Sequence, residues 1–372
     1  MIVILFLFVS ASVFYFAFLI AIGFGLKRSN KYHSNNLKTV TVIIPFRNES
    51  ANIAASIRSI KSLNYPKDLL EVIYINDNST DDSVTQIYDK TNENIKLIHN
   101  DDVKLSGFKK NAIQKAIQVS KGEIIVLTDA DCIARKNWIN AIVNSFDENT
   151  GMVVGPVKFR ASESLFSKLQ QLEFAGLMLT AAGLIGINKP VICSAANLAF
   201  RKNIFSEVGG YSDNLNLTSG DDEILMQKIN SRTNYKISFC WSADSLVETR
   251  GNESLSAFFQ QRTRWASKSL FYQNKLLIIS LFTIYIFYFL LTMHPFLFLI
   301  QPKIFFVSFI TSLFIKFILE LLIMLKGRNL LFDAKNLKYF VIAELLQIPY
   351  ITIAAISGAF GNYKWKDRKV KR

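Results

Sequence analysis

Glu123-Ile124-Ile125-Val126-Leu127-Thr128-Asp129-Ala130-Asp131 is an apolar strand pattern that ends in two carboxylates. Residues two apart in an extended backbone face the same side, so Asp129 and Asp131 point together beyond the end of the strand. Carboxylate oxygens suit a divalent cation, and a cation beside a diphosphate neutralises charge on a departing nucleotide. A single D-x-D pattern also arises by chance, as a solvated acidic turn. The neighbouring motifs therefore decide its meaning.

Strand and helix patterns alternate around this stretch. Strands are predicted at residues 40–45, 71–75, 95–99 and 123–128, and helices at 49–62, 81–90 and 108–120. Such alternation predicts an α/β fold with a mostly parallel sheet and helices on both faces. Ligands of these sheets bind beyond the carboxyl ends of the strands. Three polar runs fall there: Pro45-Phe46-Arg47-Asn48-Glu49, Asn76-Asp77-Asn78-Ser79 and Asp129-Ala130-Asp131.

The polar runs belong to a series of motifs in a fixed order. The series comprises residues 41–49, 76–81 and 128–132, then Asn197-Leu198-Ala199-Phe200-Arg201, Gly220-Asp221-Asp222-Glu223 and Gln261-Arg262-Thr263-Arg264-Trp265. In this order they resemble family 2 glycosyltransferases. The last motif is similar to the Q-x-x-R-W signature of membrane-bound members such as cellulose, chitin, hyaluronan and poly-N-acetylglucosamine synthases and ceramide glucosyltransferases. The resemblance covers residues 40–268 and implies a Rossmann-like GT-A fold and inverting sugar transfer from a nucleotide sugar.

The resemblance places the sugar donor at the strand ends. It implies that Asp77 accepts the imide N–H of a uracil ring, whereas the residues alone also favour an Asx turn there. Asn76 stands where many relatives carry a second aspartate. Asp131 is the implied ligand of Mg²⁺ or Mn²⁺ on the diphosphate, and Asp129 lies closer to the ribose or donor sugar. The remaining residues predicted to bind the donor are Pro45, Arg47 and Glu49.

The acidic run Gly220-Asp221-Asp222-Glu223 lies at a predicted junction of loop and helix. A sugar hydroxyl is a poor nucleophile, so inversion needs a general base on the face opposite the leaving diphosphate. The resemblance assigns this role to Asp222. Acids at the start of a helix also cap its free N–H groups and oppose its dipole. We expect Asp221 or Glu223 to do that capping.

The Q-x-x-R-W residues Gln261, Arg264 and Trp265 stand at helical spacing, so they share one face. That face offers an amide, a guanidinium for phosphate oxygens and an indole that stacks on a ring or closes the pocket. The same helix, residues 254–270, gathers Leu255, Phe258, Phe259, Arg262 and Trp265, which predicts an amphipathic helix against the membrane surface. An interfacial anchor without a catalytic part is the alternative.

Four long apolar runs predict a membrane protein. They are residues 1–26, 276–300, 304–325 and 339–360, and each is long enough to span a bilayer. We expect a transmembrane anchor at 1–26 (a cleaved signal peptide is the alternative), a GT-A domain at 38–270, about three membrane segments within 276–360 and a basic tail at 361–372. The shorter apolar run at 174–187 predicts a buried or interfacial helix.

Basic residues give the expected orientation. Lys27, Arg28 and Lys31 follow the first run, so the positive-inside rule puts the large domain in the cytoplasm, at a bacterial inner membrane. Four full spans would then leave the basic tail outside. Either the tail overrides the rule, or the fourth run, which contains Pro349, is a re-entrant hairpin or a tilted helix.

Charge and cysteine content exclude other classes. The net charge is +14, but much of the excess lies beside the apolar runs, where it suits anionic lipid headgroups better than nucleic acid. No zinc-finger or aromatic RNA-binding signature accompanies it. The three cysteines lack paired spacing, which indicates a reducing compartment and argues against zinc.

The expected function is transfer of a sugar, from a UDP-sugar, to a membrane-associated lipid or glycan acceptor at the cytoplasmic face, in glycolipid or cell-envelope glycan synthesis. The few membrane segments favour a lipid acceptor or short product over a polymer channel. A processive exopolysaccharide synthase is the alternative. A non-catalytic scaffold with a degenerate fold is another, which the intact acids disfavour. A nucleotidyltransferase would need a glycine- and lysine-rich phosphate loop, which Arg47-Asn48-Glu49 is not.

Overall fold

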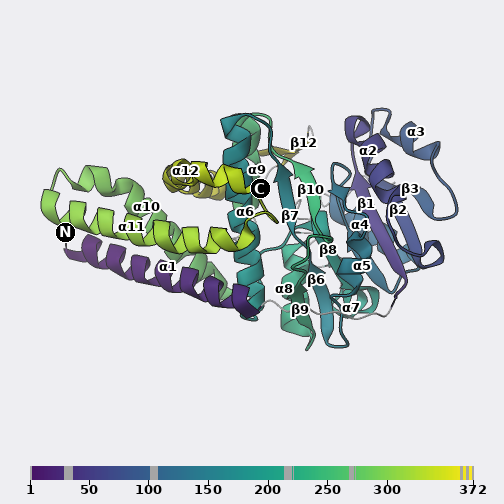
Figure 1. Ribbon diagram of the computed structural model, residues 1–372, viewed down its shortest axis with the longest axis horizontal. Helices are drawn as coiled ribbons and strands as arrows, with labels where there is room; N and C mark the ends of the chain where they lie inside the picture. The colour runs from purple at the N-terminus through teal and green to yellow at the C-terminus, as the bar shows by residue number, and fades with distance from the viewer. Residues whose placement is uncertain are drawn as a thin grey trace. The chain divides into compact units, whose positions relative to one another are not determined.

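The computed structural model describes residues 2–28, 37–100, 108–212, 220, 222–267, 272, 274–360, 363–365 and 368–370. The chain divides into two compact units (Figure 1). The sheet unit comprises Lys27–Arg160 and Thr180–Arg250, and the helical unit comprises Met1–Leu26, Ala161–Leu179 and Gly251–Arg372. Among the residues used for the predictions, Lys31, Asp221, residues 268–270 and part of the basic tail lie outside the described residues.

The sheet unit is built on a seven-stranded sheet of order β3-β2-β1-β4-β8-β6-β9. Its strands are β1 (Val40–Phe46), β2 (Leu70–Asn76), β3 (Ile95–His99), β4 (Ile124–Leu127), β6 (Thr150–Val154), β8 (Leu198–Arg201) and β9 (Lys236–Phe239). All neighbours pair in parallel except β8, which is antiparallel to both β4 and β6. The predicted α/β fold with a mostly parallel sheet is confirmed.

Helices and a small second sheet complete this unit. The helices are α2 (Ser50–Lys61), α3 (Ser83–Tyr88), α4 (Phe108–Val119), α5 (Trp138–Val143), α7 (Lys202–Glu207) and α8 (Glu223–Arg232), with short 3-10 turns η1 (Lys67–Leu69) and η2 (Ala195–Asn197). The second sheet has the order β5-β10-β7, from Ile133–Ala134, Val247–Arg250 and Val157–Arg160. Every residue of β1 is buried, as expected for a strand with both faces covered.

The carboxyl ends of β1, β2 and β4 form one rim of the sheet. Phe46 of β1 pairs with Asn76 of β2, and β4 ends at Leu127 opposite Ile43. The pairing of β1 with β4 therefore stops before Pro45. A proline is tolerated there because no bond of the ladder between β1 and β4 requires its missing N–H. The three polar runs all leave the sheet at this rim, where ligands of parallel sheets bind.

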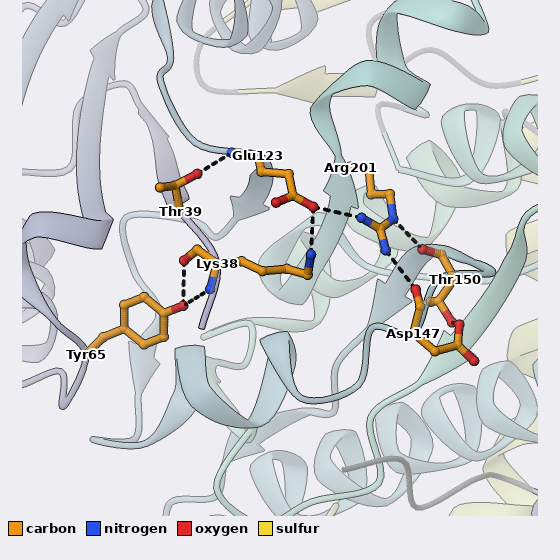
Figure 2. A network of polar contacts seen from close by, with 7 residues as sticks. All are labelled: Lys38, Thr39, Tyr65, Glu123, Asp147, Thr150 and Arg201. Atoms are coloured by element: carbon orange, nitrogen blue, oxygen red, sulfur yellow. Dashed lines mark hydrogen bonds and ion pairs between the residues drawn. The ribbon is translucent and has the colours of Figure 1, made fainter. Parts of the chain in front are cut away.

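The opposite rim is closed by a polar network (Figure 2). The carboxylate of Glu123 accepts from Lys38 and Arg201, each at 2.8 Å, and its backbone N–H donates to the hydroxyl of Thr39 at 3.0 Å. Arg201 also donates to the carbonyls of Thr150 and Asp147, at 2.9 and 2.7 Å. These contacts join the amino ends of β1, β4 and β6 to the end of the antiparallel strand β8, away from the candidate site.

The helical unit contains the long apolar helices. It holds α1 (Ile2–Arg28), the first part of α6 (Leu165–Gly186), α9 (Leu255–Ser267), α10 (Lys275–Leu297), α11 (Pro302–Gly327), η5 (Ala334–Tyr339), α12 (Phe340–Phe360) and the antiparallel pair β11 (Tyr363–Trp365) and β12 (Arg368–Val370). Within the described residues, four helical segments are long and apolar enough to cross a membrane: Ile2–Lys27, Lys275–Leu297, Pro302–Gly327 and Ala334–Ala359. They coincide with the four apolar runs of the sequence.

The fourth of these segments is not a hairpin. α12 continues through Pro349 as one helix, so of the two shapes expected for this run only the helix is found. α9 packs closely against α12. A Cβ atom added to Gly358 of α12 would lie only 2.4 Å from the Cβ of Ala266 of α9. Small residues at such crossings allow helices to approach, as is common in membrane bundles.

Candidate active site

The loop after β2 contains an Asx turn and also leaves the carboxylate of Asp77 outside that turn. Asn76 closes the Asx turn, since its Oδ1 accepts the N–H of Ser79 at 2.8 Å. Asp77 is 3% exposed, and its carboxylate accepts from the side-chain amide of Asn100 at 3.3 Å. The turn therefore does not occupy the Asp77 carboxylate, because its asparagine neighbour supplies the oxygen that closes it.

The loop after β1 is fastened to the loop after β2. Arg47 donates through Nη1 to the carbonyls of Asp77 and Asn78, at 2.8 and 2.7 Å. Asn48 accepts the N–H of Thr80 at 2.8 Å from a left-handed backbone (φ 51°), which asparagine tolerates better than most residues. These contacts make Arg47 a residue that positions Asp77, and its predicted contact with the donor stays a prediction.

Asp131 is held by two weak donors. Thr249 Oγ1 donates to its Oδ2 at 3.1 Å, and the Cys132 thiol donates to its Oδ1 at 3.5 Å. Burial raises the pKa of Asp131 above its ordinary value, and the charges of Asp129 and Glu49 raise it further. A bound divalent cation favours the ionised carboxylate and would reverse this effect.

Asp129 has a different partner, because Lys109 Nζ of α4 lies 2.8 Å from its Oδ1. Ligand atoms of Asp129, Asp131 and Cys132 all lie within 4.8 Å of one another. Burial raises the pKa of the Cys132 thiol well above its ordinary value, and the charge of Asp131 adds to the effect, so the thiol keeps its proton. The two carboxylates remain as hard oxygen ligands, which fit Mg²⁺ or Mn²⁺ better than zinc.

The turn η2 connects the D-x-D motif to Asp222. Thr128, which precedes the motif, donates through Oγ1 to the carbonyl of Ala196 at 2.9 Å. The Oδ2 of Asp222 accepts the N–H of Ala195 at 3.2 Å. The two acidic motifs, far apart in the sequence, therefore attach to adjacent residues of one turn.

The same turn is fixed from behind by Asn197, which is fully buried. Its Oδ1 accepts from the indole of Trp138 at 2.9 Å, and its Nδ2 donates to the carbonyls of Pro156 and Ser245, at 2.9 and 2.7 Å. Every hydrogen bond of this side chain thus goes to a different segment of the sheet unit. Asn197 therefore acts as a support for the turn and not as a ligand group.

The cap of α8 differs from the prediction. Asp222 itself is the N-cap, and its Oδ1 accepts the N–H of Glu223 at 2.8 Å. The expectation that Glu223 caps the helix is wrong because Glu223 is the first helical residue, and Asp221 lies outside the described residues. Asp222 is consequently held by backbone donors on both oxygens, which fixes its orientation beside η2.

In the helical unit, Gln261 and Trp265 of α9 are both held by Arg262. The guanidinium donates to Gln261 Oε1, and its Cζ lies 4.3 Å from the centre of the Trp265 ring. It also binds Glu173 of α6 through Nη2 and through Nε, the latter at 3.0 Å. Arg262, at a variable position of the Q-x-x-R-W pattern, is therefore the residue that holds Gln261 and Trp265 in place.

The membrane-facing side predicted for this helix is wrong for two of its residues. Phe258 and Arg262 are 8% and 4% exposed, because they pack against α6 and α12. The ring of Phe258 lies 6.0 Å from Phe166 and 5.5 Å from Tyr350, whose hydroxyl donates to Glu173 at 2.6 Å. Leu255, at 63% exposed, fits the predicted surface. The buried Arg262–Glu173 pair decides which face turns inward.

Arg262→Met is expected to lower the thermal stability of the purified protein sharply. The variant leaves the Glu173 carboxylate buried without its cation, which costs about 3–5 kcal/mol. Thermal unfolding in lipid nanodiscs measures the loss. The double variant Arg262→Met/Glu173→Leu should recover most of it, because no unpaired charge remains. Arg264→Met, two residues along the helix, is the matched control, and an equal loss there would refute the special role of Arg262.

The comparison with protein families agrees with this geometry. The model described as "Glycosyl transferase family 2" matches residues 41–209, which contain all but the first residue of β1, together with β2, β4 and the acids Asp77, Asp129 and Asp131. This part of the chain resembles glycosyl transferase family 2. The matched residues end before Asp222 and before α9, so the roles of these later residues rest on their motifs and contacts.

Several known proteins are similar to this chain. "Probable glycosyltransferase YdaM" of Bacillus subtilis is 30% identical over 239 residues, which are 62% of this chain and 55% of that protein. "Poly-beta-1,6-N-acetyl-D-glucosamine synthase" of Staphylococcus aureus is 29% identical over 265 residues, 68% of this chain and 60% of that protein. The chain thus spans a little over half the length of these curated relatives.

A solved structure supports the GT-A fold of this chain. It is a mannosyltransferase from Pyrobaculum calidifontis in complex with GDP-Man and Mn²⁺, with a TM-score of 0.60. Sequence identity is 18%, and the match covers 96% of this chain and 97% of that one. At this identity the likeness concerns the fold, and it confirms the predicted GT-A class.

The contacts of three residues were not predicted from the sequence: those of Lys109 and Thr249 in the sheet unit, and those of Arg262 in the helical unit. Lys109 lies in the first turn of α4, whose two lysines, Lys109 and Lys110, are the available signal for a cation that pairs with an acid. Thr249 is 118 positions from its partner Asp131, and no local pattern joins them. Arg262 lies within a motif already recognised, where its burial and not its identity gives its role.

Proposed function

We propose that this protein transfers a sugar from a nucleotide sugar, with inversion, to a membrane-associated lipid or glycan acceptor. The observation that carries the proposal is the attachment of two acidic motifs to one turn. Thr128, beside the D-x-D motif, and Asp222 bind neighbouring residues of η2. A donor held at the D-x-D acids would then lie near a carboxylate suited to act as the base.

The proposed roles follow the contacts of each acid. Asp77, whose carboxylate is not used by the Asx turn, binds the nucleobase, and Asp129, beside Lys109, faces the ribose or donor sugar. Asp131 holds Mg²⁺ or Mn²⁺, which when bound supplies positive charge to the diphosphate. Pro45 and Glu49 line the same rim. The mannosyltransferase of similar fold, solved with GDP-Man and Mn²⁺, supports the donor class and the metal.

In the proposed reaction, Asp222 takes the proton of the acceptor hydroxyl. The hydroxyl oxygen forms a bond to the anomeric carbon while the bond from that carbon to the diphosphate oxygen breaks, and the electron pair leaves with the nucleoside diphosphate. Backbone donors on both oxygens of Asp222 keep it oriented for this step. Gln261, Arg264 and Trp265 contact the acceptor or the leaving phosphates from α9.

The proposed cellular setting follows the apolar helices. The proposed catalytic domain is residues 38–270, and its helix at 254–270 meets the membrane through exposed residues such as Leu255 and not through Phe258 or Arg262. Residues 1–26 and three segments within 276–360 cross the membrane, and residues 361–372 form the basic tail. The basic residues Lys27, Arg28 and Lys31 favour a cytoplasmic catalytic domain at a bacterial inner membrane. UDP-sugar is the proposed donor, on the expectation that Asp77 reads a uracil.

A processive polysaccharide synthase is the second candidate, favoured by the similarity to poly-β-1,6-N-acetyl-D-glucosamine synthases. One experiment separates the candidates. Membranes containing the protein receive radiolabelled UDP- and GDP-sugars with Mg²⁺ or Mn²⁺. Label that enters organic solvent supports a lipid acceptor, whereas label in a precipitable polymer supports the synthase. If no donor is consumed in any combination, the transferase proposal fails and the non-catalytic scaffold remains.

A further inference from the structure

One buried polar cluster draws side chains from all four long apolar helices. Its members lie on α1, α10, α11 and α12, which all belong to the helical unit (Figure 1). They are Tyr15, Tyr288, Lys316, Glu320, Glu344 and Gln347. Ionisable groups inside such a bundle are costly, and they mark a functional site more often than an accident of packing.

Lys316 is the centre of this cluster and is fully buried. Its ammonium donates to Glu320 Oε2 at 2.9 Å, to Gln347 Oε1 at 2.9 Å and to Glu344 Oε2. An ammonium has three N–H donors, and here three acceptors receive them. Lys316 is therefore fully satisfied as a cation.

The two carboxyl groups exceed this single positive charge. Glu320 and Glu344 are each 7% exposed, so two carboxylates beside one ammonium would leave a net negative charge in the apolar bundle. Both carboxyl groups accept from the same ammonium of Lys316, so they lie close to each other. Like charges repel at that separation, whereas a carboxylic acid donates a hydrogen bond to a carboxylate.

The hydrogen bonds distinguish the two acids. Glu320 accepts from Lys316 and also from the hydroxyl of Tyr15 at 2.6 Å, which favours its ionised form. The described donor to Glu344 is Lys316 alone. Tyr288 bonds to Tyr15 at 2.7 Å and to Gln347 at 3.1 Å, so the tyrosine side chains favour Glu320 over Glu344. A proton shared by the pair would thus reside on Glu344.

We propose that Glu320 and Glu344 form a proton-binding site inside the helix bundle, in which one proton, carried by Glu344, makes the cluster with Lys316 neutral. The titratable groups that face the site are Tyr15 from α1, Tyr288 from α10 and Lys316 from α11. His294 of α10 takes no part, since its ring nitrogens bond to Leu290 and Ser308. The proton is bound by groups from different helices, so its release would disturb their packing.

Infrared spectroscopy of the full chain in lipid nanodiscs tests the proposal. At neutral pH the wild type should show the carbonyl band of a protonated carboxylic acid, displaced in D₂O. Glu344→Gln and Glu320→Gln should each abolish the band, because the remaining acid ionises to balance Lys316. Lys316→Met should instead increase it about twofold, since both acids then need a proton. Glu253→Gln, at an exposed acid, is the control and should leave it unchanged.

Other outcomes overturn the proposal. A wild type without the band means that both acids are ionised, either as a purely structural ion cluster or with a small cation in place of the proton. A band that survives in both glutamine variants places the proton elsewhere. Glu344→Gln mimics the protonated acid in shape and hydrogen bonding, so it should keep the wild-type melting temperature. It therefore remains informative even if Lys316→Met fails to fold.

Discussion

Asp131→Asn is expected to abolish sugar transfer while the protein remains folded. Asparagine keeps the size of the side chain and still accepts a hydrogen bond from Thr249, but it removes the charge that would hold Mg²⁺ or Mn²⁺. Loss of metal-assisted charge stabilisation should lower kcat/KM by about 10³-fold or more. The measurement is transfer of radiolabelled sugar by purified protein across a range of Mn²⁺ concentrations.

The metal dependence of the wild type provides a second readout of Asp131. Burial raises the pKa of its carboxyl, so the proton competes with the cation at a higher pH than for an exposed aspartate. The Mn²⁺ concentration for half-maximal activity should therefore rise as the pH is lowered. In Asp131→Asn the residual activity should no longer depend on Mn²⁺.

Glu123→Gln is the matched control, because Glu123 lies just before the opposite end of the same strand, β4. It contacts Lys38 and Arg201 at the rim away from the site (Figure 2). Its side chain is 46% exposed, so losing these pairs should cost about 1 kcal/mol or less and leave transfer intact. Activity of Asp131→Asn close to that of Glu123→Gln would refute the metal-binding role of Asp131.

The gathering of the three polar runs at one rim of the sheet was predictable because its information is local. Each of β1, β2 and β4 is a mainly apolar run with polar residues at its carboxyl end, and parallel strands bring these ends to one rim. What the sequence did not give is pairing across long separations. The antiparallel strand β8 pairs between β4 and β6, which no local pattern indicates. The contact of Thr249 with Asp131 joins residues more than a hundred positions apart.

Helix α9 shows a different limit of sequence reasoning. Its periodicity identified one helix and a face with aromatic residues, but periodicity does not reveal what covers that face. Phe258 and Arg262 suit a membrane surface as well as a protein interior, and the choice is made by Glu173 of α6 and Tyr350 of α12. A buried acid from another segment thus determines the environment of a residue within the motif.

Asp222→Asn is expected to remove catalysis and to preserve binding of the donor. Asparagine is as good an N-cap as aspartate, so α8 should stay intact, but the amide cannot accept the proton of the acceptor hydroxyl. The kcat should fall by about 10²–10⁴-fold, the usual contribution of a general base. The donor KM and the affinity for UDP, measured by calorimetry with Mn²⁺, should remain unchanged.

Asp222→Ala separates the cap from the base, since it removes both. It should lose the same catalytic activity and in addition about 1 kcal/mol of stability. Retention of kcat by Asp222→Asn would contradict the assignment of the base. The comparison with Asp131→Asn is decisive for the shared turn η2: loss of the metal ligand should weaken donor binding, and loss of the base should not. Weakened donor binding in both variants would mean that Asp222 supports the turn through the N–H of Ala195, and that the base lies elsewhere.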